Sequence, residues 1–287
     1  MPRILATLLL ILVWSQPLVT APTTSLPNRS DTLKFAVLGD NGSGDKGQYD
    51  IAARMVDVRR LFRFDFVIML GDNFYGSQSA AALIQKFDRP YKPLLDDGVT
   101  FHAAIGNHDA LATLNYPPLN MAGQRYYTYV RQQVRFFVLD TNIMDAPQLQ
   151  WFETALQGAR EPWKIAYFHH PLYGNAGRHG SAVDMRVLLE PLLLKYGVNV
   201  VFSGHDHVYE RLTPQNGIHY FVAGSGGKLR KGNLEPSATT AAGFDQDQVF
   251  MVVEVDADEL FFQAISRTGV TVDSGVILRL PIRPGTM

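Results

Sequence analysis

The hydrophobic positions along this chain form short apolar runs that alternate with stretches of helical periodicity. Consecutive apolar residues between polar segments are typical of strands that are buried on both faces. Such runs predict strands at Leu33–Leu38, Phe66–Leu70, Phe101–Ile105, Lys164–Phe168 and Val198–Ser203. Between them, apolar residues recur every three or four positions, which predicts helices at Gln48–Phe62, Ala80–Phe87, Ala146–Leu156 and Asp184–Lys195.

The last part of the chain differs, because helical periodicity ends near Val208. Strands are predicted there at Ile218–Val222, Val249–Val255 and Leu260–Ile265. Further upstream, Tyr126–Val130 and Val134–Leu139 predict a hairpin closed by residues 131–133. Ala223–Asp247 is rich in Gly, Ser and Thr and predicts a long surface loop. The order of elements predicts an α/β layered domain that ends in β-strands.

The N-terminal segment has the composition of a secretory signal peptide. Arg3 precedes the apolar stretch Ile4–Trp14, and small residues lie at Val19-Thr20-Ala21. We therefore expect residues 1–21 to be a signal peptide, residues 22–32 a tail, and residues 33–287 one catalytic domain. The apolar stretch is too short to span a bilayer, which favours a secreted or periplasmic protein without stable membrane insertion. The alternative is an uncleaved hydrophobic anchor.

The amino-acid composition limits which metal sites and catalytic groups this protein can have. The 287 residues include eight histidines and no cysteine, so thiolate metal sites, disulfides and cysteine nucleophiles are excluded. Any metal must be held by nitrogen and oxygen atoms. The formal net charge of −1 gives no indication of a nucleic-acid partner, and the sequence favours no particular oligomeric state.

One pattern recurs at the ends of the predicted strands: an apolar run, then Gly, then a residue able to bind metal. It ends at Asp40, Asp72, Asn107 and His205, and a further strand ends directly at His169. In α/β sheets, ligands bind beyond the carboxyl ends of strands. Each Asp or Asn taken alone is explained equally well as a turn or helix-capping residue. Capping requires neither His nor a repeated Gly, so the set favours one shared site.

Gly204-His205-Asp206-His207 adds a geometric argument. In an extended chain His205 and His207 lie on the same face, about 7 Å apart between Cα atoms. Two metal ions about 3.5–4 Å apart could each bind one of these imidazoles. Carboxylate, amide and imidazole ligands together suit iron, manganese or zinc. Tyr75, three residues after Asp72, is an aromatic packing residue by default, but as a phenolate it would suit iron(III).

These motifs resemble the five ordered motifs of the purple acid phosphatases, which are calcineurin-like metallophosphoesterases. The resemblance covers most of the chain from Asp40 to Arg211, and the small tartrate-resistant type is closest in size. The fold it implies is a four-layer α/β/β/α sandwich of two mixed β-sheets flanked by helices. The motifs are Asp40-Asn41-Gly42, Gly71-Asp72-Asn73-Phe74-Tyr75, Gly106-Asn107-His108-Asp109, the His169 segment and Gly204-His205-Asp206-His207.

The resemblance also implies a binuclear metal centre with iron(III) and a divalent ion of iron, zinc or manganese. Asp72 would bridge the two ions. Iron(III) would be held by Asp40, Asp72, Tyr75 and His207, and the divalent ion by Asp72, Asn107, His169 and His205. His169 is preferred to His170 because the family's ligand lies two residues before a proline, here Pro171.

The activity implied is hydrolysis of a small phosphate monoester, with metal-bound hydroxide attacking phosphorus. His108 and His179 are the candidate catalytic residues that contact phosphate or donate a proton to the leaving group. Asp109 is expected to orient His108, and His170 to support His169 or to pack beside it. A solvent-exposed loop histidine is the alternative for His179.

Two other functions use similar ligands. Phosphodiesterases of the same superfamily usually carry a histidine ligand two residues after the first Asp, whereas this chain has Gly42 there and Tyr75 as the replacement. A non-catalytic or redox-active di-iron or phosphate-binding protein would keep the same metal ligands. The presence of His108 and His179 favours hydrolysis.

Overall fold

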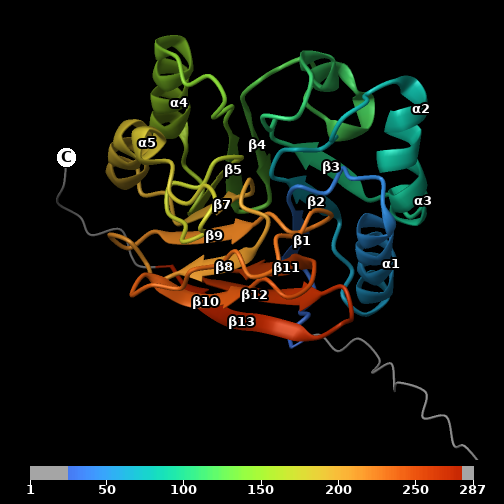
Figure 1. Cartoon of the computed structure of the whole chain (residues 1–287). Helices are drawn as coiled ribbons and strands as arrows, with labels where there is room; N and C mark the ends of the chain where they lie inside the picture. The colour runs from blue at the N-terminus through green and yellow to red at the C-terminus, as the bar shows by residue number, and fades with distance from the viewer. Residues whose placement is uncertain (1–24, 280–287) are drawn as a thin grey trace, which may run out of the picture.

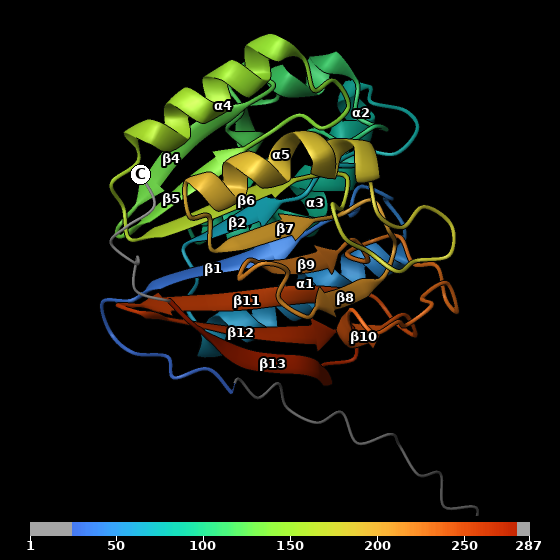
Figure 2. The same ribbon diagram turned by 90° about the vertical axis from the view of Figure 1, so that its left-hand side faces the viewer.

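The structure is a computed structural model that describes residues 25–279. The predicted signal peptide, residues 1–21, and the beginning of the predicted tail lie outside the described residues. Within them the chain forms two mixed β-sheets that pack face to face, with helices on both outer faces (Figures 1 and 2). The predicted four-layer fold is therefore confirmed.

The first sheet has six strands in the order β13-β12-β11-β1-β2-β3. Its three parallel strands β1, β2 and β3 carry the first site motifs at their carboxyl ends. The strands are β1 (Leu33–Leu38), β2 (Phe66–Met69), β3 (Thr100–Ala103), β11 (Val249–Asp256), β12 (Glu259–Ser266) and β13 (Thr271–Leu278).

The second sheet has seven strands in the order β10-β8-β9-β7-β6-β5-β4. Strands β5, β6, β7 and β9 are parallel, so β6 and β7 deliver the histidine motifs to one edge. The strands are β4 (Tyr127–Arg131), β5 (Val134–Val138), β6 (Trp163–Phe168), β7 (Val200–Ser203), β8 (Tyr209–Leu212), β9 (His219–Ala223) and β10 (Thr240–Phe244).

The core between the sheets is largely aromatic. The Phe35 ring on β1 lies 5.5 Å from the Phe136 ring on β5 and 6.4 Å from the Phe202 ring on β7, both in edge contacts. Each such side chain, fully buried, contributes roughly 1.5–3 kcal/mol of transfer free energy. Because these contacts join the two sheets, they fix the relative position of the strand ends that carry the site.

Helices cover the outer faces. Ile51, Met55 and Val58 of α1 are buried toward the first sheet, while Phe152 of α4 and Leu189 of α5 join a separate apolar cluster on the second. Asp45 and Asp145 begin α1 and α4 by accepting hydrogen bonds from the backbone N–H groups of the first turn. The helices are α1 (Lys46–Leu61), α2 (Ala80–Leu83), α3 (Arg89–Asp96), α4 (Ala146–Gly158) and α5 (Val183–Lys195).

The helical segment predicted at Ala80–Phe87 extends further along the chain than predicted. After α2 the chain forms a π-helical turn, Ile84–Asp88, and continues directly into α3. Pro90 has no N–H group, which frees the carbonyl of Lys86 from helix bonding. That carbonyl instead accepts a hydrogen bond from the Gln48 side chain of α1. Two short 3₁₀ turns, Leu111–Asn115 and Pro117–Leu119, follow β3.

The prediction of a surface loop at Ala223–Asp247 is wrong in two respects. The segment contains β10, which pairs antiparallel with β8. Its beginning is also buried, because residues 224–227 pack against the chain around Asp40, where the Gly226 N–H donates to the Gly39 carbonyl. Strands β8 and β13 were not predicted either, and in β13 the apolar residues are mostly exposed or only half-buried. Within residues 25–279, no helix combines the length and apolar character needed to cross a membrane.

Candidate metal centre

The strand ends bring the predicted ligand residues together at one edge of the sandwich. Asp40, Asp72 and Asn107 follow β1, β2 and β3, and His169 and His205 follow β6 and β7. The two sheets thus contribute to a single cluster of oxygen and nitrogen atoms. This is the arrangement expected when ligand-binding residues lie beyond the carboxyl ends of neighbouring parallel strands.

The backbone at this edge is in a conformation that non-glycine residues seldom adopt. Asp40, Asp72 and His205 have φ angles of 54°, 51° and 68°, in the left-handed region. Such conformations cost of the order of 1–3 kcal/mol each and concentrate at functional sites. Gly106 permits the close packing, because a Cβ atom there would lie 2.2 Å from the Asp72 backbone nitrogen.

We call the group formed by Asp40, Tyr75 and His207 the buried half. The Tyr75 hydroxyl donates to Asp40 Oδ1 at 2.9 Å and lies 3.0 Å from His207 Nε2. Asp40 is fully buried and His207 is 9% exposed. Asp40 Oδ2 accepts from the backbone N–H of His205 at 2.8 Å, which fixes the carboxylate relative to the next motif.

We call the group formed by Asn107, His169 and His205 the open half. Asn107 Oδ1 lies 2.9 Å from His169 Nε2 and 3.1 Å from His205 Nδ1. The His169 ring is oriented from behind, because its Nδ1 lies 2.9 Å from the Leu70 carbonyl oxygen. Asn107 is exposed to solvent, in contrast to every member of the buried half.

Asp72 lies between the two halves. Its Oδ1 is 3.4 Å from His169 Nε2, and its carboxylate also belongs to a cluster with Asp40 and His207 whose ligand atoms lie within 4.8 Å of one another. The backbone N–H of His108 donates to the same Oδ1 at 2.8 Å. The seven predicted ligand residues therefore form two adjoining groups that share Asp72.

The electrostatics of these side chains fit metal ions. Burial, followed by the nearby Asp72, raises the pKa of Asp40 well above its usual range, because two carboxylates share one dry site. Burial and neighbouring histidines lower the pKa of His205 to about 2, and burial and Arg230 lower that of His207 to about 4. The imidazoles are thus neutral, with lone pairs free to bind, and among the described residues no Lys or Arg forms an ion pair with Asp40 or Asp72.

Tyr75 also fits. Burial and the two nearby carboxylates raise its pKa far above the usual range, so the phenol keeps its proton and donates to Asp40. A phenolate at this position would therefore require a strongly charged cation beside it. Carboxylate, phenolate and imidazole form a donor set suited to iron(III), and amide with two imidazoles a set suited to a divalent transition metal.

The two candidate catalytic histidines flank the cluster from opposite loops. The His108 ring lies 4.8 Å from the Tyr75 ring, and the His179 ring lies 4.2 Å from the His205 ring. Both side chains are exposed. The loop that carries His179 is anchored by Asn175, whose Nδ2 donates to Glu210 Oε1 at 2.7 Å. Both histidines can thus contact a substrate that approaches the cluster from the solvent.

Asp109 has a different role from the one expected. Among the described residues it makes no hydrogen bond to the His108 side chain. Its buried carboxylate instead accepts from the backbone N–H groups of Gly106 and Phe74, at 2.8 and 2.9 Å, and from Asn73. It therefore ties the Asp72–Tyr75 loop to the Asn107 loop. Burial outweighs these bonds and raises the pKa of Asp109 to about 7.

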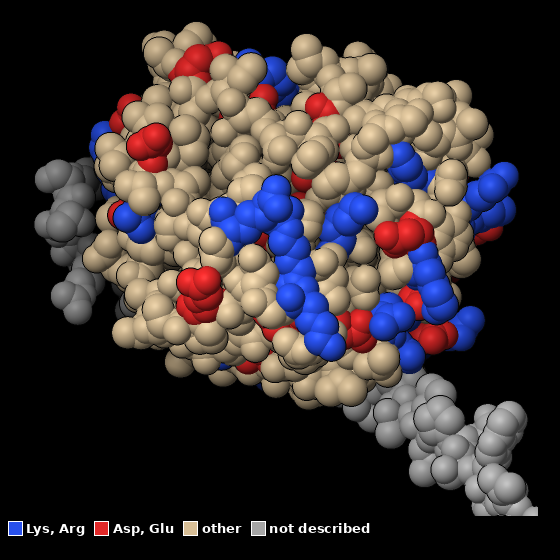
Figure 3. Space-filling model, viewed as in Figure 1, with Lys and Arg blue, Asp and Glu red and all other residues tan. Residues whose placement is uncertain are grey.

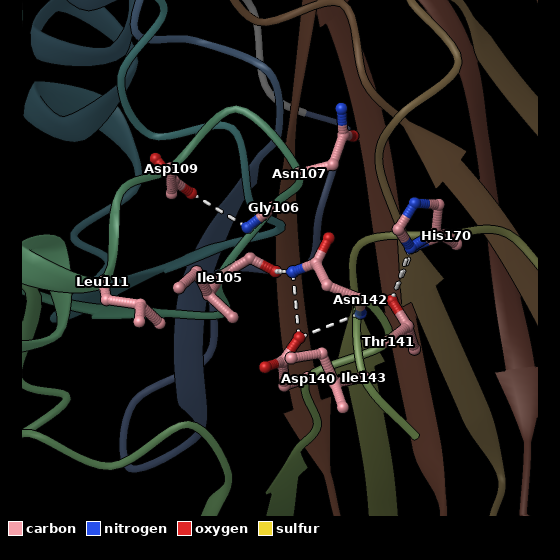
Figure 4. Close-up of a pocket in the computed structure, with 10 residues that line it drawn as sticks. All are labelled: Ile105, Gly106, Asn107, Asp109, Leu111, Asp140, Thr141, Asn142, Ile143 and His170. Atoms are coloured by element: carbon pink, nitrogen blue, oxygen red, sulfur yellow. Dashed lines mark hydrogen bonds between the residues drawn. The ribbon is translucent and has the colours of Figure 1, made fainter. Parts of the chain in front are cut away.

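His170 lies closer to the cluster than a packing residue would. A ring nitrogen of His170 lies within 4.8 Å of ligand atoms of His169 and His205. Its Nδ1 is 2.8 Å from the Thr141 hydroxyl, which orients the ring. His170 and Asn107 also line a pocket of about 410 Å³ (Figure 4). The exposed side chains of Leu111 and Ile143 give that pocket an apolar part.

Two cations near the cluster were not singled out from the sequence. Lys228 Nζ lies 5.2 Å from the centre of the Tyr75 ring, and the Arg230 backbone N–H donates to the His207 carbonyl at 3.0 Å. Both follow the glycine-rich run after β9, which the sequence suggested to be a surface turn. The only sequence signal was the run Gly224-Ser225-Gly226-Gly227-Lys228, a composition also typical of anion-binding loops.

Comparison with known proteins agrees with this geometry. Residues 33–209 match the model of the calcineurin-like phosphoesterase family. The chain is 26% identical to mouse tartrate-resistant acid phosphatase type 5, covering 75% of this chain and 77% of that protein. It is also 26% identical to purple acid phosphatase 3 of Arabidopsis thaliana, over 88% of this chain and 80% of that protein.

Solved structures show the same fold at lower identity. GAP50, described as the anchor in the inner membrane complex of Plasmodium, superposes with a TM-score of 0.76 and 20% identity, over 88% of this chain and 90% of that one. The purple acid phosphatase PPD1 from yellow lupin gives 0.73 and 20%, over 88% of this chain and 55% of that one.

The fold and the ligand cluster thus define a metallophosphoesterase. The chain belongs to the calcineurin-like phosphoesterase family, and its acid phosphatase relatives confirm the predicted resemblance to purple acid phosphatases and the prediction of a hydrolase.

Proposed function

We propose that this protein is an exported acid phosphatase that uses two metal ions to hydrolyse phosphate monoesters. The observation that carries the proposal is the pair of adjoining ligand groups that share Asp72. Two groups so close together fit two ions with a common ligand, which is the arrangement used to hydrolyse phosphoesters. The similarity to acid phosphatases over three quarters of the chain supports the same activity.

Asp40, Tyr75 and His207 would hold iron(III), and Asn107, His169 and His205 a divalent ion of iron, zinc or manganese, with Asp72 common to both. The distribution of charge supports this order, because the buried half supplies anionic ligands and the open half neutral ones. When bound, the two ions would attract the phosphate dianion and lower the pKa of water that serves as the nucleophile.

His108 and His179 would act on the substrate from the solvent-exposed side of the cluster. Burial and the cations Arg230 and Arg178 lower the pKa of His179, so this ring is suited to donate a hydrogen bond to phosphate as a neutral imidazole. His108 lies beside Tyr75 on the other side of the cluster and is the better candidate to donate a proton to the departing alcohol. His170, held by Thr141, would keep the His205 ring in place at 4.4 Å.

A preference for monoesters over diesters is supported by the packing at Gly42. A Cβ atom at Gly42 would lie 1.8 Å from the Asn73 carbonyl oxygen, so a histidine ligand could not enter there without moving the loop. The Gly42 carbonyl also accepts from the Tyr75 N–H at 2.9 Å. The packing at Gly42 therefore favours Tyr75 over a histidine as the ligand, as in the purple acid phosphatases.

The test is phosphate release from 4-nitrophenyl phosphate by protein of measured metal content, between pH 4 and 8. We expect turnover with a maximum below pH 7, and slower release from bis(4-nitrophenyl) phosphate. Fully metallated protein without turnover would exclude the phosphatase and favour a metal- or phosphate-binding protein. A faster reaction with the diester would favour a phosphodiesterase.

Export is tested separately. The composition of residues 1–21 supports cleavage by a signal peptidase. Mass spectrometry of protein recovered outside the cytoplasm should give an N-terminus near residue 22. Intact protein that stays in the membrane fraction would instead support the uncleaved anchor.

A further inference from the structure

Three cations lie on loops beside His207 of the metal centre. Arg178 lies in the loop after β6, while Lys228 and Arg230 lie in the loop after β9. The two loops are joined, because the Gly177 N–H donates to the Asn233 carbonyl at 2.8 Å. Lys and Arg side chains gather near the middle of the face seen in Figure 3. We call Arg178, Lys228 and Arg230 the cationic cluster.

The carboxylates nearest to the cationic cluster lie beyond ion-pair distance. Among residues 25–279, none of its members forms an ion pair, although Arg211 and Arg135 elsewhere in the chain are each paired at 2.7 Å. Arg230 Nη1 is buried without a hydrogen-bond partner. Like charges held near one another repel unless an anion binds among them.

The two arginines are close enough to affect each other, and all three cations act on His207. Burial, followed by Arg178, lowers the pKa of Arg230, and both arginines lower that of His179. Asp206 and Asp40 attract Arg230 without reaching ion-pair distance. Lys228 lies over the Tyr75 ring. The positive field of the cationic cluster therefore extends to the edge of the ligand groups.

The opposite side of the centre has a different charge. The pocket beside Asn107 is lined by the carboxylates Asp109 and Asp140, and only Asp140 has a paired cation, Arg125, at 2.6 Å. None of the residues that line the pocket is a Lys or Arg, so an anionic group on a substrate would be attracted to the cationic cluster rather than to that pocket. The two sides thus favour one orientation of a charged substrate.

We infer that the cationic cluster is a second anion subsite, and that the preferred substrate is a phosphate monoester whose alcohol part carries a further carboxylate or phosphate. This inference rests on the proposed phosphatase activity and specifies its substrate class. The reacting phosphate would lie at the metal centre and the second anion between Arg178, Lys228 and Arg230.

The test compares phenyl phosphate with 4-carboxyphenyl phosphate, which differ by one negative charge. For each protein the ratio of kcat/KM for the two substrates is measured with the metal-loaded enzyme. Arg178→Gln, Lys228→Gln and Arg230→Gln should each reduce the preference for the carboxylated substrate, roughly three- to tenfold. Added salt should reduce it in the unmodified enzyme. Lys92→Gln, an exposed cation on α3, is the matched control and should leave the ratio unchanged.

The outcomes separate the two proposals. If both substrates turn over and the cluster variants leave the ratio unchanged, the second subsite is excluded while the phosphatase stands. An equal loss on both substrates would also exclude it, since the cations would then hold the reacting phosphate. Absence of turnover on both substrates would overturn the phosphatase itself, and the inference with it. Arg178 is exposed, so its variant serves even if Arg230→Gln fails to fold.

Discussion

The two halves of the metal centre differ in both burial and charge. Asp40 and His207 of the buried half are almost inaccessible to solvent, whereas Asn107 of the open half is exposed. The buried half carries the anionic ligands, while Asn107, His169 and His205 are neutral. A highly charged ion held in a dry pocket by anions should exchange slowly. A divalent ion held mainly by neutral ligands, with Asn107 exposed and His169 buried, should exchange more readily.

The comparison with GAP50 shows why these ligands matter more than the fold. That protein has the same fold by TM-score, yet it is described as an anchor. The sandwich alone therefore does not decide between hydrolysis and binding. The decision rests on the side chains at the strand ends, and the following substitutions address the two halves in turn.

The largest effect is expected at Asp72, because it serves both halves. Asp72→Asn removes the shared negative charge, and kcat/KM for an aryl phosphate should fall by roughly 10³-fold, equivalent to about 4 kcal/mol. Metal analysis should show loss of both ions. Asp96→Asn, an exposed carboxylate on α3, is the control and should retain metal and activity. Retention of two ions by the Asp72 variant would show that the halves bind independently.

Tyr75→Phe should affect the buried half alone. If the Tyr75 phenolate binds iron(III), the protein has a visible charge-transfer band, and the substitution should abolish it. The ring packing against His108 and His207 is kept by Phe, so the fold should be unaffected. Tyr49→Phe, on the exposed side of α1, is the matched control. A band of unchanged intensity in the Tyr75 variant would mean that the tyrosine is not the chromophoric ligand.

Asn107→Ala should affect the open half alone. Loss of the amide oxygen should weaken binding of the divalent ion by at least about tenfold, while the visible band remains. Competition with a chelator, followed by metal analysis, measures the difference directly. We expect a chelator to remove one ion from the unmodified protein as well, and added divalent metal to restore activity. Simultaneous loss of both ions would contradict the proposed difference between the halves.

The sequence could bring several of the candidate ligand residues together because they follow closely on buried strands. Asp40, Asp72 and His205 are positioned by β1, β2 and β7, and a strand end leaves a side chain little freedom. Lys228 and Arg230 could not be placed in this way. They lie beyond the glycine run after β9, and their position depends on long-range backbone contacts such as that of the Lys228 N–H with the Asp40 carbonyl.

The remaining errors have a similar origin. β13 was missed because Asp273, Ser274 and Gly275 interrupt its apolar residues, and as an edge strand it pairs only with β12. The hydrogen-bond partners of Asp109 could not be predicted for a comparable reason. Proximity in sequence suggested His108 as its partner, whereas the fold brings the backbone of Phe74 to it from another strand end.

The smallest effect concerns a histidine away from the metal centre and bears on stability in acid. His102 on β3 is 8% exposed, stacks on Tyr129, and its Nε2 lies 3.3 Å from Arg131 Nη2. Burial, followed by Arg131, lowers the pKa of His102 from 6.5 to about 4. Between these values the unfolded chain binds the proton and the folded chain does not, so stability falls as the pH drops from 6.5 toward 4.

His102→Phe keeps the stacking on Tyr129 and removes the titrating group. The loss of unfolding free energy on acidification should therefore be smaller in this variant, by about 3 kcal/mol at most. Urea unfolding at pH 7.5 and at pH 4.5 measures the change. Thr100→Val, beside His102 but without a titrating group, should keep the slope of the unmodified protein. An identical slope in His102→Phe would mean that acid sensitivity arises elsewhere. The metal centre would then be the first place to examine, because its histidines stay neutral in the folded protein and take up protons below pH 6.5 only in the unfolded chain.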